Sequence, residues 1–425
     1  MCYDDRNLFA IKPVREYGMS DKRKKELFLF FAVIVAVNLA MGFSDGLFSN
    51  YFKDVYHTDG RERGLIELPR ELPGVITFFL ISAFAFLGDI TIAILAQGIA
   101  AIGLMVLGLV TPSFGVMLVF LFINSLGVHL YMPLKDSIGM SLSEPDQIGK
   151  RMGQFSGISF AVLTVSGLAV FFLFRFGVFS FASKTKWTFV VAAIFYLVAI
   201  AMMIRLKLAV GQMRTKREKI KLIFRKEYKF YYLLAIVFGV QKQVMLVFGP
   251  WVLIETLGQR VDTIVLLGIV ASTLGIFFMP QLGKWIDRFG VKKLLFADAF
   301  SFIFVYLCYG MLAQRFNGGA LAKVGLPVLL TCALFVVDRL SSQMGIIRTI
   351  YLKSIAFESA DVTPTLSLAM MMDHVVSIIV GVTGGIAWVK FGSHTIFYAV
   401  AVLSLINLAV AILVKDPRKL EVRLQ

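Results

Sequence analysis

The 425-residue chain has few of the residues on which disulfide, metal and enzyme chemistry depend. It contains three cysteines, Cys2, Cys308 and Cys332, and four histidines. No CxxC pair and no Cys/His cluster occurs in the sequence, so neither a disulfide framework nor a metal site is indicated. HExxH, Walker A and nucleophile-elbow motifs are missing too, and the histidines are scattered over distant segments. We therefore expect no catalytic residues, no metal and no bound cofactor.

Charged residues are also scarce. They make up 16% of the chain, whereas hydrophobic residues make up 58% and the mean hydropathy is +0.80. This composition lies far outside the range of soluble globular proteins. Apolar runs of about 20 residues recur along the sequence, which is the length needed to cross the ~30 Å hydrocarbon core of a bilayer. We therefore predict an all-α polytopic membrane protein.

The apolar runs predict twelve transmembrane helices in two groups of six. The first group is expected at 27–52, 64–87, 90–111, 114–137, 152–176 and 187–206, and the second at 230–256, 263–284, 294–314, 325–347, 364–388 and 394–414. The expected domains are an N-terminal tail (1–26), an N-terminal six-helix bundle (27–206), a basic linker (207–229), a C-terminal six-helix bundle (230–414) and a C-terminal tail (415–425). The linker is interpreted either as an amphipathic helix on the inner leaflet or as a solvated connection.

The distribution of basic residues predicts the orientation in the membrane. Lys and Arg together number 43 against 27 Asp and Glu, which gives a net charge of +16. In a soluble protein this excess would suggest nucleic acid binding, but in a membrane protein Lys and Arg gather in cytoplasmic segments. Here they concentrate in both tails and in the linker. We expect a monomer in the cytoplasmic (inner or plasma) membrane with both termini cytoplasmic, whose partners are the lipid bilayer and a small-molecule substrate, and no nucleic acid.

A short motif follows the eighth predicted span. Residues 283–293 read GKWIDRFGVKK, which resembles the G-x-x-x-D-R-x-G-[RK]-[RK] loop of the major facilitator superfamily. In that family the loop lies on the cytoplasmic side, between the second and third helices of a six-helix half, and the motif occupies the matching place here. The sequence departs from the pattern in two ways. Val291 stands at a usually basic position, and the first half has only FLGDIT (86–91) at the equivalent loop.

The resemblance implies the fold of that family, in which two six-helix bundles enclose a central cavity and expose it to each side of the membrane in turn. It also implies a gating role for the loop, whose carboxylate and basic side chains would latch the cytoplasmic face. The candidate latch residues are Gly283, Asp287, Arg288, Gly290 and Lys292. A generic basic loop is the alternative interpretation.

Ionisable residues lie deep within several apolar spans, where an unpaired charge costs at least about 2.5–3.5 kcal/mol. Such side chains are expected to face the protein interior or a watery cavity. Asp338 and Arg339 lie near the centre of the tenth span, and Asp373 and His374 near the centre of the eleventh. We interpret Asp338, Asp373 and His374 as proton-coupling candidates. A structural Asp–Arg pair that braces the two spans is the alternative.

A second cluster lies at the outer end of the second span. Glu67, Arg70 and Glu71 fall at positions i, i+3 and i+4, hence on one helical face. Glu67 and Glu71 are expected to gate the outer face or to line an outer vestibule. His129 by itself is expected to be a packed polar residue. The candidate substrate-binding and cavity residues over the whole chain are Asp45, Asn50, Arg70, Tyr131, Gln241, Lys242, Gln243 and Arg339.

The cavity candidates carry both charges, which favours a zwitterion or an organic anion as the substrate. The leading hypothesis is a secondary active transporter, a symporter or antiporter that moves a small organic solute across the cytoplasmic membrane by alternating access. A gradient of protons or of another ion is expected to drive it, because no Walker A motif indicates ATP. A drug or metabolite efflux permease of the same fold is the alternative. From a different class, a polytopic membrane enzyme or a channel remains open.

Overall fold

The computed structural model describes residues 21–144, 148–211 and 224–414, and every regular element within these ranges is helical. Both predicted tails fall almost wholly outside them. The central part of the predicted linker does so too, and with it the proposed amphipathic helix. The statements below concern the described residues.

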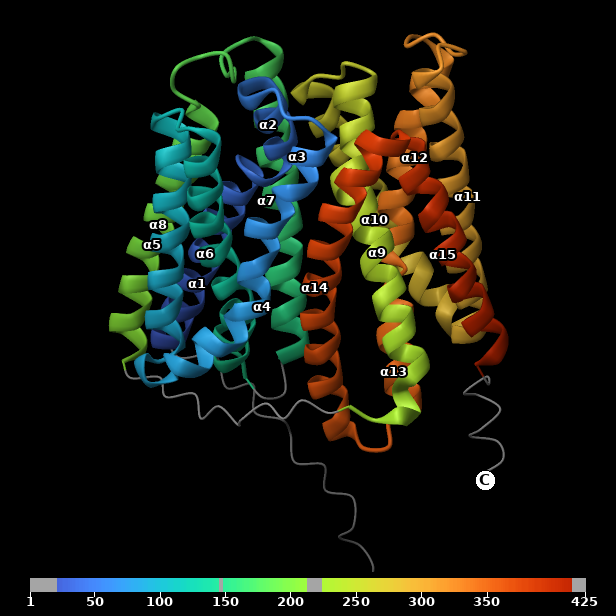
Figure 1. Ribbon diagram of the computed structural model, residues 1–425. Coiled ribbons are helices and arrows are strands. Elements are labelled where there is room, and N and C mark those ends of the chain that lie inside the picture. The colour runs from blue at the N-terminus through green and yellow to red at the C-terminus, as the bar shows by residue number, and fades with distance from the viewer. Residues whose placement is uncertain (1–20, 145–147, 212–223, 415–425) are drawn as a thin grey trace, which may run out of the picture.

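Six membrane-crossing segments form the N-terminal half (Figure 1). The first consists of α1 (Asp21–Gly42), η1 (Asp45–Leu47) and α2 (Phe48–Tyr56), and the second of α3 (Gly60–Leu65) and α4 (Glu67–Ala83). After the short η2 (Ala85–Leu87) come α5 (Asp89–Leu109), α6 (Phe114–Ser141), α7 (Ile148–Arg175) and α8 (Trp187–Val210).

The C-terminal half repeats this plan. Its first segment consists of η3 (Lys226–Tyr228), α9 (Lys229–Trp251) and η4 (Val252–Thr256). The remaining segments are α10 (Val261–Phe289), α11 (Val291–Asn317), α12 (Leu326–Gln343) with α13 (Ile346–Ile355), α14 (Ser359–Phe391) and α15 (His394–Leu413). Eleven helical segments are long and apolar enough to cross a bilayer. The twelfth predicted span is the pair α3 and α4, each of which is short by itself.

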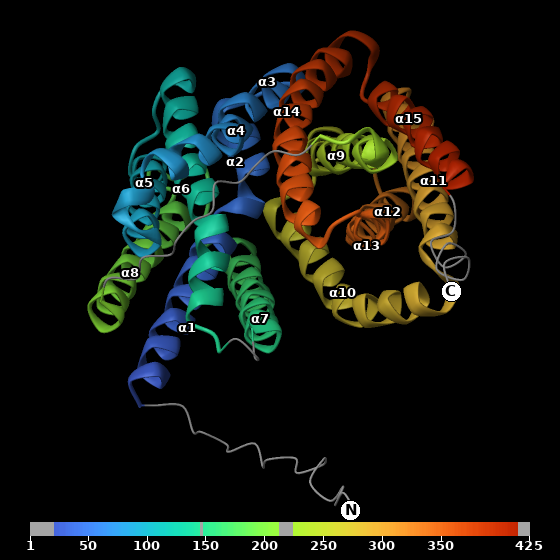
Figure 2. The same ribbon diagram turned by 90° about the horizontal axis from the view of Figure 1, so that it is seen from below.

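The two halves form two bundles that stand side by side (Figure 2). The N-terminal bundle has one large apolar core. The C-terminal bundle has two smaller ones, one towards the end that is predicted to be outer and one towards the end that is predicted to be inner. The bundles meet where α14 contacts α3 and α4, and where α10 contacts α7. The predicted fold of two six-helix bundles is confirmed.

Capping interactions end the first span and start the second. His57 ends α2 in the left-handed conformation (φ 53°), and its backbone N–H bonds to carbonyls of the last turn. Asp59 then starts α3: its carboxylate accepts from the Glu62 N–H at 2.8 Å, and the Glu62 carboxylate accepts from the Asp59 N–H at 3.2 Å. This tight reversal brings α3 back against α14.

Candidate functional site

Glu67 is the centre of a buried hydrogen-bond network between the bundles. It lies in the first turn of α4 with a fully buried side chain. Its Oε1 accepts from Arg63 at 2.5 Å and from Arg70 at 2.8 Å. Its Oε2 accepts from Gln243 of α9 at 2.9 Å. One carboxylate therefore compensates two guanidinium groups and joins α4 to the other bundle. The sequence reasoning missed Arg63, because residue 63 falls just before the predicted start of the span.

Glycines allow α3 and α14 to touch backbone to backbone beside this network. A Cβ atom at Gly64 would lie 2.1 Å from the Gly381 carbonyl oxygen, and one at Gly385 would lie 2.7 Å from the Gly60 carbonyl oxygen. Because these distances leave no room for a side chain, only glycine fits at these positions. Small residues of this kind are typical of close helix pairs in membranes. The two bundles touch at this contact, in the half of the molecule that the sequence predicts to be the outer one.

Two ion pairs add to the contact between the bundles at the outer ends. Lys53 pairs with Glu255 at 3.2 Å, and Arg175 pairs with Asp262 at 3.2 Å. Each pair joins one bundle to the other. Three of the four side chains, all but Asp262, keep substantial exposure. We therefore expect each pair to contribute little to the free energy of unfolding.

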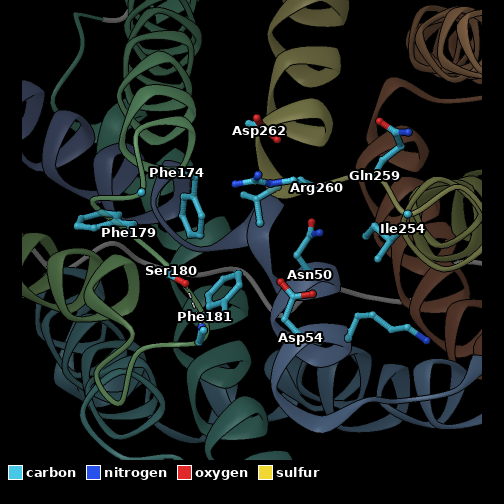
Figure 3. Close-up of a pocket in the computed structure, with 15 residues that line it drawn as sticks. Asn50, Asp54, Phe174, Phe179, Ser180, Phe181, Ile254, Gln259, Arg260 and Asp262 are labelled. Carbon is cyan, nitrogen blue, oxygen red and sulfur yellow. Dashed lines mark hydrogen bonds between the residues drawn. The ribbon is translucent and has the colours of Figure 1, made fainter. Parts of the chain in front are cut away.

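A cavity of about 430 Å³ opens beside these ion pairs (Figure 3). Both bundles line it with polar and aromatic side chains, among them Asn50, Asp54, Phe181, Gln259 and Arg260. Asn50, a predicted cavity residue, is buried there and its Oδ1 has no hydrogen-bond partner within the described part of the chain. The cavity lies at the outer end of the contact rather than between the span centres.

Lys242 and Asp373 form an ion pair at the centre of the C-terminal bundle. Lys242 donates from α9 to Asp373 on α14, and the two side chains are 35% and 22% exposed. A Cβ atom at Gly239 would lie 2.8 Å from Asp373 Oδ1, so this glycine makes room for the carboxylate. Because a charged pair within membrane-spanning helices avoids lipid, we expect the exposed part of this pair to face water.

Asp45 and Arg70 are two oppositely charged residues within the spans of the N-terminal bundle, as Lys242 and Asp373 are in the C-terminal bundle. The Asp45 side chain is exposed, and the Arg70 side chain is 22% exposed. The two groups are near enough to interact electrostatically. Ionisable side chains within membrane-spanning segments are expected to face protein or water rather than lipid.

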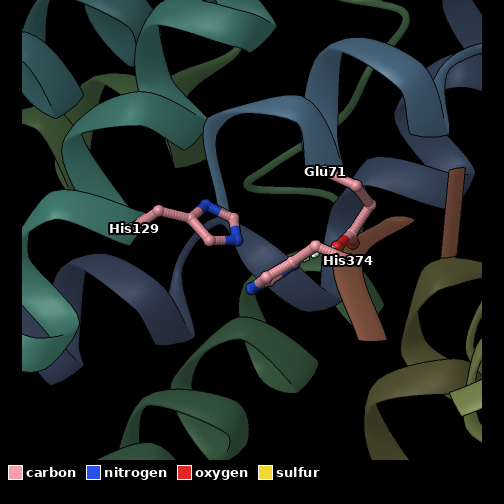
Figure 4. A group of neighbouring side chains, drawn as sticks. All are labelled: Glu71, His129 and His374. Carbon is pink, nitrogen blue, oxygen red and sulfur yellow. Dashed lines mark hydrogen bonds and ion pairs between the residues drawn. The ribbon is translucent and has the colours of Figure 1, made fainter. Parts of the chain in front are cut away.

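Glu71, His129 and His374 come together from α4, α6 and α14 (Figure 4). His374 Nδ1 lies 2.8 Å from a Glu71 carboxylate oxygen, and His129 Nδ1 lies 2.9 Å from the Ser125 carbonyl oxygen. The two imidazole rings are 5.0 Å apart between centroids at an interplanar angle of 71°. His129, expected to be a packed polar residue, is therefore part of a cluster between the bundles. Sequence spacing holds no sign of it, because the three residues come from three helices.

Asp338 and Arg339 are neighbours in the sequence, but their side chains lie in different environments. Asp338 is 1% exposed, and the Tyr306 and Ser342 hydroxyls and the Arg339 guanidinium lie near its carboxylate, although neither oxygen meets strict hydrogen-bond geometry among the described residues. Arg339 lies over the Phe335 ring, with the guanidinium carbon 4.9 Å from the ring centroid. The alternative of an Asp–Arg brace between the two spans is not what forms, because Asp373 pairs with Lys242.

Three other candidate residues lie inside the bundles. Gln241 is fully buried and donates to Ser404 of α15 at 2.7 Å, so it faces the C-terminal bundle. Gln243 lies on a different face of α9 and donates to Glu67 of the N-terminal bundle. Tyr131 is 4% exposed, and its hydroxyl has no partner among the described residues.

The loop motif stabilises the inner end of the C-terminal bundle. Gly290 takes φ 82° between α10 and α11, a conformation that favours glycine. Lys292 donates to the carbonyl oxygens of Ile412 and Val414 at 3.0 and 2.7 Å, which are orphan acceptors at the end of α15. Arg288 lies over the neighbouring Phe289 ring. A Cβ atom at Gly283 on α10 would meet no other atom within 4 Å. The structure shows Lys292 binding helix-end carbonyls within its own bundle.

Comparisons with known proteins agree on the type of protein. The family model described as Major Facilitator Superfamily matches residues 29–357. No curated protein matches the sequence. The fold is similar to that of the nucleoside transporter NupG, with a TM-score of 0.72 and 13% identity over 92% of this chain and 99% of that one.

Two further solved structures are similar to this chain. An auto-inhibited POT family peptide transporter has a TM-score of 0.71 and 12% identity, over 91% of this chain and 96% of its own. A D-xylose-proton symporter has a TM-score of 0.66 and 16% identity, over 92% of this chain and 98% of its own. At such low identities the likeness shows the fold alone.

Proposed function

The chain belongs to the major facilitator superfamily and is an integral membrane transporter of that type, and from this premise we propose that it carries a small zwitterionic solute by alternating access, driven by protons. One observation carries the proposal on the substrate. Four ionisable side chains of both signs, two from each bundle, keep solvent exposure within membrane-spanning segments: Asp45, Arg70, Lys242 and Asp373.

The Lys242–Asp373 pair provides a mechanism for recognising both charges of a zwitterion. A solute carboxylate can take the place of Asp373 beside Lys242, while a solute ammonium group pairs with the released Asp373. The exchange replaces one ion pair by two, so neither Lys242 nor Asp373 is left without an opposite charge. An organic anion would use Lys242 and Arg70 and leave Asp373 without a partner, which favours the zwitterion.

The contacts between the bundles support alternating access. The glycine contact of α3 with α14, the Glu67 network and the two outer ion pairs all lie between the outer ends and the middle of the spans. We infer a state closed to the outside. Separating these contacts while the inner ends approach would expose the same central charges to the other side.

The proposal is tested by a thermal-shift screen of amino acids, betaines and organic acids on the purified protein, followed by uptake of the best ligand into proteoliposomes. We expect a zwitterion to raise the melting temperature, and Lys242→Ala to remove both the shift and the uptake. Lys390→Ala, at an exposed outer position on α14, is the control and should retain both. A ligand whose shift survives Lys242→Ala would contradict the proposed site, and hits confined to anions would contradict the zwitterion.

Asp338 is the strongest candidate for the proton carrier. Asp373 and His374 pair with Lys242 and Glu71 at close range, whereas the buried carboxyl group of Asp338 forms no close ion pair among the described residues and has only Arg339 and two hydroxyl groups nearby. An ionised carboxylate is costly in such a place unless a partner moves in. Protonation of Asp338 can therefore be linked to a rearrangement of the helices around it.

A further inference from the structure

We propose that His129 and His374 form a binding site for a borderline divalent transition-metal cation such as Zn²⁺, with Glu71 orienting the second histidine. The site would join the two bundles, since His129 and Glu71 belong to one and His374 to the other. It is independent of the proposed substrate site, which uses other side chains.

The hydrogen bonds of the two imidazoles are those of metal-binding histidines. His374 can donate its Nδ1–H to the Glu71 carboxylate at 2.8 Å, and His129 can donate its Nδ1–H to the Ser125 carbonyl oxygen at 2.9 Å. A histidine whose Nδ1 proton is held by an oxygen presents the Nε2 lone pair, and metal-ligating histidines are almost always oriented in this way. Both rings of the cluster therefore offer Nε2 as the free donor.

The placement of the rings fits one shared ion. In Figure 4 the remaining nitrogen of each ring is directed towards the other histidine, and the candidate ligand atoms of the three residues all lie within 4.8 Å of one another. Two imidazoles that bind one Zn²⁺ at about 2.0–2.1 Å with a tetrahedral angle have ring centres roughly 5 Å apart. The observed separation is 5.0 Å, so an ion can be shared with little movement of either ring.

The surroundings hold the rings in place and leave the site accessible. The side chains of His374 and Glu71 are 16% and 12% exposed. A Cβ atom at Gly74 would lie 2.5 Å from the His374 ring, so this glycine lets the ring lie flat against α4. Arg70 interacts electrostatically with His129, and its charge is compensated by Glu67 at 2.8 Å. Two nitrogen ligands suit Zn²⁺, Ni²⁺ or Cu²⁺, while Mg²⁺ and Ca²⁺ prefer oxygen ligands.

The test is calorimetric titration of ZnCl₂ into the purified full-length protein, freed of any affinity tag and in the absence of transport substrate. We expect one saturable site per chain that excess Mg²⁺ or Ca²⁺ does not occupy. His129→Gln and His374→Gln should each weaken binding at least ~100-fold, and Glu71→Gln about 10–100-fold. His57→Gln and His394→Gln remove the other two histidines of the chain and should leave binding unchanged.

A second variant covers the case in which a histidine substitution unfolds the protein. Gly74→Ala keeps all three side chains but pushes the His374 ring aside, and it should weaken Zn²⁺ binding without deleting a ligand. The proposal is overturned if wild-type protein shows no saturable site, or if binding is unchanged in the cluster variants that fold. Binding that disappears only in His57→Gln or His394→Gln would show adventitious surface binding and would also overturn it. Because no solute is present, these results do not depend on the proposed transport function.

Discussion

At the scale of single residues, Asp338 stands out because buried polar groups usually form hydrogen bonds. Arg339 and the hydroxyl groups of Tyr306 and Ser342 lie near its carboxylate. The Tyr306 hydroxyl donates to the Gln241 carbonyl oxygen, and neither carboxylate oxygen accepts a hydrogen bond of strict geometry among the described residues. A buried polar group without a partner lowers stability by about 1–3 kcal/mol. Natural proteins retain such a cost mainly at functional positions.

We therefore expect Asp338→Asn to separate proton coupling from solute binding. The variant should still exchange labelled for unlabelled solute across proteoliposome membranes, because the cavity charges are intact. It should lose accumulation driven by a pH gradient, because an amide cannot carry the proton. Asp136→Asn, at an exposed inner position, should behave like wild type. Unchanged accumulation in Asp338→Asn would show that another group carries the proton.

At the scale of helices, the Glu67 network connects α3, α4 and α9 through one carboxylate. Arg63 is 1% exposed, and Glu67 is its carboxylate partner within the described part of the chain. Removing the negative charge would leave two guanidinium groups facing each other in a buried site. The network is therefore an obligatory part of the outer contact, whereas the exposed ion pairs at the outer ends are not.

We expect Glu67→Gln to lower the free energy of unfolding by about 3–5 kcal/mol, the usual cost of breaking a buried ion pair. The measurement is denaturant unfolding in detergent micelles or bicelles. Asp136→Asn interrupts an exposed ion pair and should cost less than about 1 kcal/mol. Equal effects of the two substitutions would mean that the Glu67 network does not stabilise the outer contact.

At the scale of the whole molecule, the two bundles meet along α3, α4, α7, α10 and α14. The α3–α14 contact relies on glycine spacing rather than on interlocking side chains. Such a contact can separate as a unit without leaving apolar side chains to be repacked. This suits a transporter that must open and close the same surface repeatedly.

A side chain at Gly64 should therefore shift the molecule towards an outward-open state. Gly64→Val places methyl groups against the α14 backbone, where the Gly381 carbonyl oxygen leaves no room. Spin labels at Lys184→Cys and Lys323→Cys, on exposed outer loops of the two bundles, should move apart in double electron–electron resonance measurements with the native cysteines replaced. Gly268→Val adds the same side chain to open space on α10 and should leave the distance unchanged. An unaltered distance in Gly64→Val would contradict the role of this contact.

Much of the architecture was predictable because it depends on local composition. Apolar runs set the spans, and the motif at 283–293 identified the family, since the bilayer imposes both length and sidedness on each helix. The main error of placement was local. The second span begins at Gly60, earlier than expected, because the Asp59–Glu62 capping box starts a helix in polar sequence. That error removed Arg63 from consideration.

The sequence by itself determined that this protein crosses the membrane many times in two halves, because hydrocarbon excludes polar chain wherever it occurs. It also showed which spans carry costly ionisable groups. Only the tertiary structure decided which of those groups meet: Lys242 with Asp373, Glu67 with two arginines and a glutamine, and Glu71 with two histidines. These partners come from helices far apart in the chain. Their encounter depends on how each helix is rotated and how the bundles meet, which no linear spacing records.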